Sequence, residues 1–399
     1  MSPERIDFAE YEGGRRLLVA APIAAVVGAG LLAVAFVLDP RRAFYGYLTG
    51  YAFALSFALG ALVFLMIVNT MNATWPVALR RLNEAIAGTL PLFIPLFVPI
   101  LFGLRALYPW TTPAAIGDPH LRTVIVHQQA FLNPPFFIAR AALYLFVWGA
   151  IGALLRRWSL AQDVDGPPPE PWKIRARVLS AVGLPPIGLT LTFASFDWLM
   201  SLSPAWQSTI YGLYFFAGAA LAGVAALVLA TLCVQREGFL LEVRGAHYYA
   251  LGRLLLTFVI LWAYIAFFQF LLIWIADKPD EVPYYIARLH TSWRYESIAL
   301  VVGQFVVPFL LLLPYRPKRS GRFLFAVALW LAVAHYLDVH WLVVPSGYPA
   351  GITVHIGDLG GALFSGGLAV AFGVWLLRGH PLVPRNDPAL SRALEYRSR

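Results

Sequence analysis

The stretch that decides the fold runs from Thr209 to Val234 and reads TIYGLYFFAGAALAGVAALVLATLCV. It is 26 residues long and contains no Asp, Glu, Lys or Arg. A helix needs about 20 consecutive apolar residues to cross the hydrocarbon core of a bilayer. The stretch therefore predicts a membrane-spanning helix.

Similar stretches recur along the whole chain of 399 residues, of which 60% are hydrophobic and 13% are charged. Soluble domains are about 45–50% apolar and about 25% charged, and disordered chains combine low hydrophobicity with high charge. The composition excludes both classes and indicates an all-α integral membrane protein. We expect ten spans, which are Leu17–Leu38, Tyr47–Val68, Ala85–Leu107, Pro134–Leu155, Arg177–Phe196, Thr209–Val234, His247–Ala276, Glu296–Leu313, Gly321–Val344 and Gly357–Leu377.

The basic residues predict the orientation of these spans. Of the 30 Lys and Arg residues, 22 fall on one side of the predicted topology and 8 on the other. Cytoplasmic loops carry the excess of Lys and Arg, so we expect a multi-pass membrane protein with both termini in the cytoplasm. The net charge of +9 reflects this bias. Because the basic residues form no continuous stripe, no nucleic-acid partner is expected. We expect membrane lipids to surround the spans.

The chain also shows an internal repeat, in which spans two to five resemble spans six to nine. The triplet at 49–51 matches that at 209–211, and the fifth and ninth spans carry Asp197 and Asp338 near their outer ends. Both copies cross the membrane in the same direction, which is typical of a parallel repeat. We expect two four-helix bundles (47–196 and 209–344), a first helix (17–38), a last helix (357–377) and cytoplasmic segments (1–16 and 378–399).

Protonatable side chains gather on the predicted outer half, which holds six of the eight histidines. His335 and Asp338 are three residues apart and share one face of the ninth span. Because an intramembrane carboxylate is costly, it is a functional hypothesis by default. An imidazole can accept a phenolic proton while a carboxylate orients it, as quinol oxidation requires. The alternatives are a structural polar contact between helices or an Asp338 that lies at the membrane interface.

Other polar residues in or near the spans have two interpretations each. Asp197 can pair with Arg105 or Arg140 to hold the first bundle together, or it can belong to a second proton or quinone site. His127 belongs to a proton-handling zone or is an ordinary polar loop residue. Four further residues line a proton path from the cytoplasm or are isolated polar groups, namely His247, Arg253, Gln269 and Gln304.

Cofactor chemistry is limited by the single cysteine, Cys233. One cysteine allows no internal disulfide, no thiolate-held iron–sulfur cluster and no C-x-x-C-H haem attachment. Haem b needs a pair of facing histidines, and His335 is the one deep candidate. We expect no metal site and no covalently bound cofactor. Redox centres would then lie on partner subunits, and the cofactor that this chain contacts would be a diffusible quinone.

Three segments carry a family resemblance: FDWLMSLSPAWQSTIYGLYFFAG at 196–218, FQFLLIWIA at 268–276 and HYLD at 335–338. They resemble the ActF-type membrane subunits of bacterial alternative complex III, a quinol:cytochrome c or cupredoxin oxidoreductase. The resemblance implies an NrfD-like (polysulfide-reductase-like) fold of two four-helix bundles. It also implies a location in the bacterial plasma membrane and a role in quinone interaction or proton translocation coupled to menaquinol oxidation.

The same resemblance implies partner subunits, namely an ActC-like sister and subunits that hold iron–sulfur clusters and haem c. In that family the quinol site next to an iron–sulfur cluster is placed in the sister. One alternative is therefore a structural anchor, as a degenerate copy of the sister, or an NrfD-type anchor of another redox complex. A secondary transporter is a further alternative, although its ionisable residues would be expected near the midplane.

Overall fold

The computed structural model describes residues 10–163 and 171–397. The described residues form helices and no strand, apart from an isolated bridge between Glu10 and Pro381. Ten helical stretches among them are long and apolar enough to cross a membrane. The predicted all-α class and the predicted number of spans are thus confirmed for this part of the chain. Residues 1–9 of the predicted segment 1–16, and 398–399 at the other end, lie outside the described residues.

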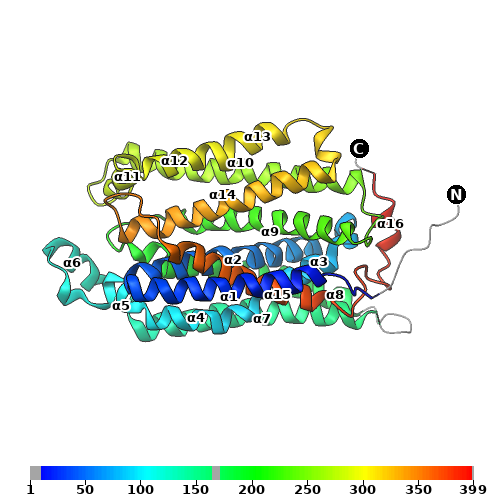
Figure 1. Cartoon of the computed structure of the whole chain (residues 1–399), viewed down its shortest axis with the longest axis horizontal. Coiled ribbons are helices and arrows are strands. Elements are labelled where there is room, and N and C mark those ends of the chain that lie inside the picture. The colour runs from blue at the N-terminus through cyan, green and yellow to red at the C-terminus, as the bar shows by residue number, and fades with distance from the viewer. Residues whose placement is uncertain (1–9, 164–170, 398–399) are drawn as a thin grey trace.

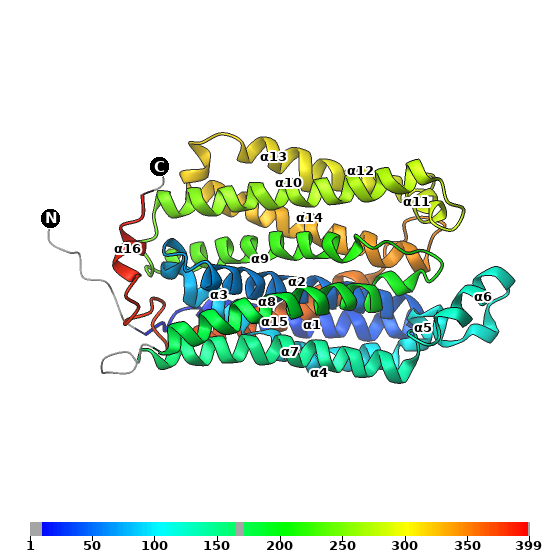
Figure 2. The ribbon, with the colours of Figure 1, turned by 180° about the vertical axis from the view of Figure 1, so that it is seen from behind.

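The membrane-length helices run side by side along one axis (Figure 1). α1 begins at the end of the bundle that also holds α16 (Leu390–Leu394), and we call this the terminal end. α6 (Pro119–Gln128) and α11 (Val282–Leu289) lie at the opposite end, which we call the loop end (Figure 2). The spans are α1 (Arg15–Leu38), α2 (Pro40–Thr70), α3 (Arg80–Ala87) with α4 (Phe93–Phe102), α7 (Pro134–Ala161), α8 (Pro171–Trp198), α9 (Tyr211–Arg236), α10 (Gly245–Ala276), α12 (Arg294–Leu300) with η6 (Val301–Val306) and α13 (Val307–Leu312), α14 (Gly321–Gly347) and α15 (Ile356–Leu377).

A capping group moves the start of α2 away from the predicted limit of its apolar run. α2 begins at Pro40 and not near Tyr47, because the Asp39 side chain accepts a hydrogen bond from the Arg42 backbone N–H at 3.0 Å. A proline in the first turn of a helix costs no hydrogen bond, since that N–H would have no intrahelical partner. The third span is interrupted between α3 and α4, where Pro91 lies in a short 3-10 turn.

Helices α2 and α9 form the centre of the bundle, with 72% and 78% of their most apolar windows buried. Their backbones meet at glycines: a Cβ atom on Gly60 would lie 1.8 Å from the Ala219 carbonyl oxygen. α15 packs on α2 in the same way, where a Cβ on Gly50 would lie 2.0 Å from the Gly361 carbonyl carbon. Small residues permit such close approach of helices.

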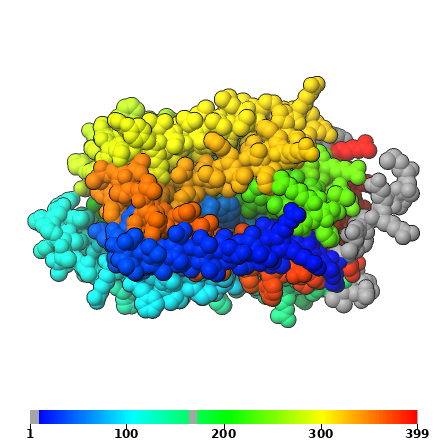
Figure 3. Space-filling model, viewed as in Figure 1, coloured from blue at the N-terminus to red at the C-terminus, as the bar shows by residue number. Residues whose placement is uncertain are grey.

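The first spanning helix packs against the last one. A Cβ atom on Gly28 of α1 would lie 2.4 Å from the Phe364 backbone nitrogen of α15, and one on Gly360 would lie 3.0 Å from the Leu32 nitrogen. In the space-filling view α1 extends across one face of the molecule (Figure 3). The two ends of the sequence thus close one side of the bundle together.

Buried apolar side chains form two clusters. The larger one includes α2, α4, α7 and α8, together with the loop-end parts of α9, α10 and α14. The smaller one, which we call the terminal-end cluster, joins the other ends of α9, α10 and α14 with side chains that follow α15, such as Leu382 and Leu390. The polar groups described next lie on α14 just beyond the terminal-end cluster.

Candidate functional site

A buried carboxylate, Asp338 on α14, lies where four helical segments converge. It is 1% exposed. The Tyr214 hydroxyl of α9 donates to its Oδ1 at 2.5 Å, and Trp262 Nε1 of α10 donates to its Oδ2 at 3.1 Å. Gln304 Nε2 of η6 donates to the same Oδ2 at 3.3 Å. All three donors are neutral, so the carboxylate is solvated by protein groups and not paired with a fixed cation.

His335 lies one helical turn before Asp338 on the same face, as the sequence predicts. Its Nδ1 is 3.6 Å from Asp338 Oδ2, and its Nε2 is 2.8 Å from the Ser56 hydroxyl oxygen of α2. Ser56 donates its own proton to the Phe53 carbonyl oxygen at 2.6 Å, so its oxygen accepts from Nε2–H. His335 Nδ1 is buried and has no hydrogen-bond partner among the described residues. The imidazole therefore lies beside the carboxylate without a hydrogen bond to it.

Gln304 reaches Asp338 because its helix is locally wound as a π-helix at Val301–Val306. Pro308 follows directly, and its missing N–H leaves a carbonyl of the preceding turn without its usual donor. Trp330 Nε1 of α14 supplies a donor to the Gly303 carbonyl at 2.6 Å. π-turns of this kind are frequent at functional sites. Gln304 is fully buried, and its Oε1 has no partner among the described residues.

A groove of about 560 Å³ lies beside the carboxylate, between α10 and the α12–η6 segment. Its walls are almost entirely apolar or aromatic. Two wall residues, Tyr214 and Trp262, are the same side chains that donate to Asp338. Wall residues such as Tyr264 and Phe267 are more than half exposed on the flank of the bundle, so the groove opens sideways. The volume is in the range of sites for small organic ligands.

The charge of the second buried carboxylate, Asp197 at the end of α8, is neutralised by a cation. Arg140 of α7 binds it with two hydrogen bonds, Nε to Oδ2 at 2.8 Å and Nη2 to Oδ1 at 2.6 Å. Tyr144 adds a third, at 2.9 Å to Oδ2. Arg140 also donates to the Phe131 carbonyl and lies over the Phe131 ring. Of the two predicted partners the structure selects Arg140, and the Arg105 side chain is exposed.

His127 lies in α6 at the loop end, away from both carboxylates. Its side chain is exposed, and its Nδ1 lies 2.8 Å from the Thr123 carbonyl oxygen. It lines a second cavity of about 230 Å³ together with Phe131 and Phe196. The structure therefore links His127 to Arg140 only through the Phe131 ring, which lines this cavity and lies over the guanidinium, and shows no contact between His127 and Asp197.

The four residues of the predicted cytoplasmic proton path are dispersed along the bundle. His247 is buried at the terminal end, with Nε2 2.9 Å from the Ala393 carbonyl oxygen. Arg253 is exposed, and Gln269 bonds to Ser208 and Tyr285 toward the loop end. Gln304 alone of the four contacts Asp338. Apolar residues of the terminal-end cluster separate His247 from Trp262 along α10, so the path stays a prediction.

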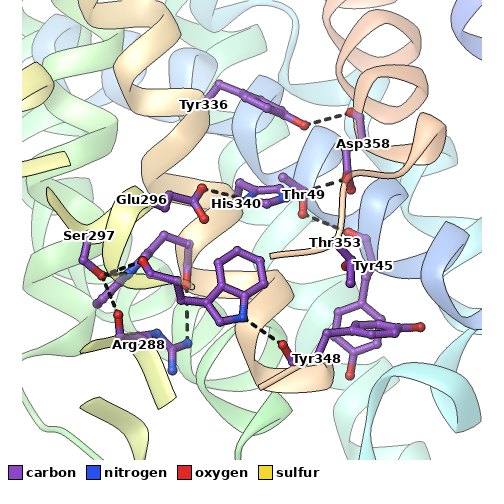
Figure 4. A network of polar contacts seen from close by, with 12 residues as sticks. Tyr45, Thr49, Arg288, Glu296, Ser297, Tyr336, His340, Tyr348, Thr353 and Asp358 are labelled. Atoms are coloured by element: carbon purple, nitrogen blue, oxygen red, sulfur yellow. Dashed lines mark hydrogen bonds and ion pairs between the residues drawn. The ribbon is translucent and has the colours of Figure 1, made fainter. Parts of the chain in front are cut away.

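A further network, which the sequence did not reveal as a unit, surrounds His340 on α14 (Figure 4). His340 Nδ1 lies 2.8 Å from Glu296 Oε1, and its Nε2 lies 3.7 Å from Asp358 Oδ2. Arg42 binds both oxygens of Asp358 at 2.6 Å. Tyr336 donates to the Asp358 backbone carbonyl at 2.9 Å. The sequence shows Tyr336 and His340 four residues apart, on one helix face. Their partners Glu296 and Asp358 lie on other helices, so the sequence could not identify the network.

Arg288 of α11 is a buried cation near the groove that the sequence analysis did not single out. It is 1% exposed and lies 3.4 Å from the Tyr284 ring centroid and 4.8 Å from that of Trp341. It donates to the carbonyls of the same two residues at 3.0 and 3.3 Å. Burial lowers the pKa of Arg288 and raises the pKa of Tyr284. Among the described residues, no carboxylate pairs with this guanidinium.

No protein-family model matches this chain, and no curated protein matches it. Among the described residues, no group of three or more His, Cys, Asp or Glu side chains could hold a metal ion. What the site can do chemically therefore follows from its own groups. It offers an aromatic groove, hydroxyl and indole donors in the groove wall, and behind them a carboxylate with an imidazole nitrogen 3.6 Å away.

Proposed function

We propose that this chain is a membrane subunit of a quinol:electron-acceptor oxidoreductase, and that a quinol ring occupies the groove between α10 and α12–η6. One observation carries the proposal: Tyr214 and Trp262 belong to the groove wall and hydrogen-bond Asp338. Aromatic walls suit a flat ring. The opening on the flank of the bundle suits a ligand that arrives from the lipid phase with a long apolar tail.

The proton chemistry follows from the hydrogen bonds. Oxidation of a quinol to a quinone releases two protons and two electrons. A quinol hydroxyl can donate its proton to the Tyr214 oxygen while Tyr214 passes its own proton to Asp338 Oδ1. Asp338 passes this proton to His335 Nδ1, 3.6 Å from its Oδ2, and can then accept the second quinol proton by the same route, which leaves Tyr214 unchanged. The electrons pass to redox centres on partner subunits, since this chain has a single cysteine.

The finer architecture is part of the same proposal. The offset of 160 residues that carries Thr49 onto Thr209 also carries Tyr144 onto Gln304. Each of these two side chains donates to the Asp at the end of its own half, Asp197 or Asp338. This correspondence supports two NrfD-like four-helix bundles related by a parallel repeat.

The resemblance to ActF-type subunits supports the biological setting of the proposal. That setting is a complex of the alternative complex III type that oxidises menaquinol in a bacterial plasma membrane. The partner subunits would be an ActC-like sister and subunits that hold iron–sulfur clusters and haem c. Both termini of this chain would be cytoplasmic. Co-purification of haem-containing subunits with a tagged chain tests this setting directly.

Replacing the carboxylate tests the role of Asp338. In the intact complex, Asp338→Asn should lower quinol:acceptor turnover by roughly 10²-fold or more, the usual contribution of a positioned proton acceptor. The matched control is Asp197→Asn, which removes the other buried carboxylate and should leave turnover near that of the wild type once assembly is verified. Wild-type turnover in a fully assembled Asp338→Asn complex would refute the proposed role.

The second candidate function is a structural anchor for peripheral subunits. It is favoured by the fully buried, triply hydrogen-bonded state of Asp338, which needs no ligand to be stable. Filling the groove with Ala263→Trp separates the two candidates. An anchor would keep both assembly and turnover, whereas a quinol-binding subunit would keep assembly and lose turnover.

A further inference from the structure

Three basic side chains converge on a groove at the terminal end of the bundle. Arg156 comes from the end of α7, and Arg378 and His380 come from the turn that follows α15. Trp375 and Leu376 from the last turn of α15 complete the lining, and the groove has a volume of about 320 Å³. It is remote from Asp338 and plays no part in the proposed quinol chemistry.

The groove is held in shape by bonds among its surroundings. The Arg156 guanidinium donates to the Leu376 carbonyl at the end of α15. The turn after α15 is fixed by two backbone bonds to Tyr11, from Tyr11 N–H to the His380 carbonyl at 3.0 Å and from Gly379 N–H to the Tyr11 carbonyl at 3.1 Å. Gly379 adopts a φ of 72°, a left-handed conformation that glycine tolerates without strain.

Positive charge in the groove is not neutralised by the described residues, none of which forms an ion pair with Arg156, Arg378 or His380. The charge of Glu84 acts on Arg156 and that of Asp163 acts on His380, but both carboxylates are bound to Arg81. Burial lowers the pKa of His380, and the charges of Arg156 and Arg81 lower it further, although Glu10 and Asp163 oppose this. An anion would find favourable potential here. Arg156 already donates a hydrogen bond to a carbonyl at the C-terminal end of α15, where the helix dipole is negative. Arg378 and His380 are therefore the side chains more available to bind an anion.

The position of the groove indicates which anion it meets. Trp375 is 62% exposed in the last turn of a membrane-length helix, and tryptophan favours the headgroup level of a bilayer. The terminal end is also the side with the excess of Lys and Arg, and basic pockets on the cytoplasmic side of membrane proteins attract anionic lipid headgroups.

We propose that this groove binds the phosphodiester headgroup of an anionic glycerophospholipid. Arg378 and His380 contact the phosphate, Arg156 closes its inner side, and the Trp375 ring packs against the glycerol and the first acyl carbons. A free phosphate ion shares the phosphate chemistry but would not use Trp375. The test must therefore separate these two ligands.

The test uses the full-length protein, purified, delipidated and supplied with phosphatidylglycerol or phosphatidylcholine, with retained lipid counted by native mass spectrometry. The wild type should retain phosphatidylglycerol in preference to phosphatidylcholine. Arg378→Gln should lower that retention about fivefold, the effect of one cation near a lipid surface. The double variant Arg378→Gln/His380→Gln should lower the retention of phosphatidylglycerol further. Arg316→Gln, an exposed cation elsewhere at the terminal end, is the matched control and should retain the lipid as the wild type does.

Three outcomes would overturn the proposal. One is equal retention of the two lipids by the wild type, and another is an equal loss of phosphatidylglycerol in Arg316→Gln and Arg378→Gln. The third is full displacement of the lipid by millimolar inorganic phosphate together with normal retention by Trp375→Ala, which would identify a phosphate-ion site. Loss of retention in Trp375→Ala supports the lipid. Thiol-dye melting curves verify that each variant is folded.

Discussion

At the scale of single residues, the two buried carboxylates show how far sequence reasoning reaches. The sequence identifies Asp197 and Asp338 as candidates, because a carboxylate in an apolar span costs free energy and is retained for a function or a partner. For Asp197 the sequence proposed Arg105 or Arg140, and sequence distance alone could not choose between residues at similar depth on neighbouring helices. For Asp338 it proposed His335, but Tyr214 and Trp262 came from helices whose rotation about their axes no local pattern reveals.

Removing the cation beside Asp197 should destabilise the protein strongly. Arg140→Met leaves a buried carboxylate without its partner, and loss of one member of a buried pair costs about 3–5 kcal/mol. The double variant Arg140→Met/Asp197→Asn should recover a large part of that loss, because no unpaired charge remains. Cys233 is the sole thiol and is half-buried, so its reaction with a thiol-sensitive dye on heating reports unfolding. Equal melting temperatures for the single and double variants would contradict this account.

At the scale of helices, the sequence predicted the existence of every span but not its ends or its irregularities. Runs of about 20 apolar residues identify spans reliably, because lipid offers no partner to an open backbone. Helix ends depend on single capping contacts, such as that of Asp39 with Arg42. The π-turn at Gln304 depends on Pro308 in sequence and on Trp330 in another helix, and only the proline is visible locally.

The close contact between α2 and α9 should not tolerate a methyl group. Gly60→Ala would place a Cβ 1.8 Å from the Ala219 carbonyl oxygen, so the two helices must move apart. We expect a loss of at least about 1–3 kcal/mol, the usual cost of overpacking. Gly30→Ala on α1 is the control, since its Cβ meets nothing within 4 Å. A melting temperature that falls equally in both variants would show that the contact is not the cause.

The π-turn should relax when its proline is replaced. Pro308→Ala restores a backbone N–H, which favours a regular α-helical pattern through this segment. The Gln304 side chain would then rotate away from Asp338, and the carboxyl vibration of Asp338 in infrared spectra should shift as it does in Gln304→Leu. If Gln304→Leu shifts the infrared band and Pro308→Ala leaves it at the wild-type position, then the proline does not hold Gln304 against Asp338.

At the scale of the whole molecule, the ten spans place the start of α1 and the short helix α16 at one end of the bundle (Figure 1). That geometry agrees with an even number of crossings. The distribution of Lys and Arg predicts which side of the membrane this end faces. The packing of the helices on each other was less accessible from the sequence, because no local pattern reveals that α2 and α9 contribute to both buried apolar clusters.

Cysteine labelling in intact cells checks the orientation. In a Cys233→Ser background, Ala115→Cys lies at the loop end and Ser391→Cys in α16 at the terminal end, and both positions are exposed. A membrane-impermeant maleimide should label Ala115→Cys from outside and should label Ser391→Cys only after the membrane is permeabilised. The reverse pattern would invert the predicted topology.

The packing of α1 on α15 has a consequence for the synthesis of the protein. About 300 residues separate the two helices, and at roughly 5–20 residues per second the ribosome needs on the order of tens of seconds to bridge that gap. During this time Gly28 of α1 and Gly50 of α2 lack the α15 backbone that packs on them, so lipid or an insertase must cover these two positions. A nascent chain that stops before Ile356 therefore remains an open intermediate, which cellular proteases can distinguish from the finished protein.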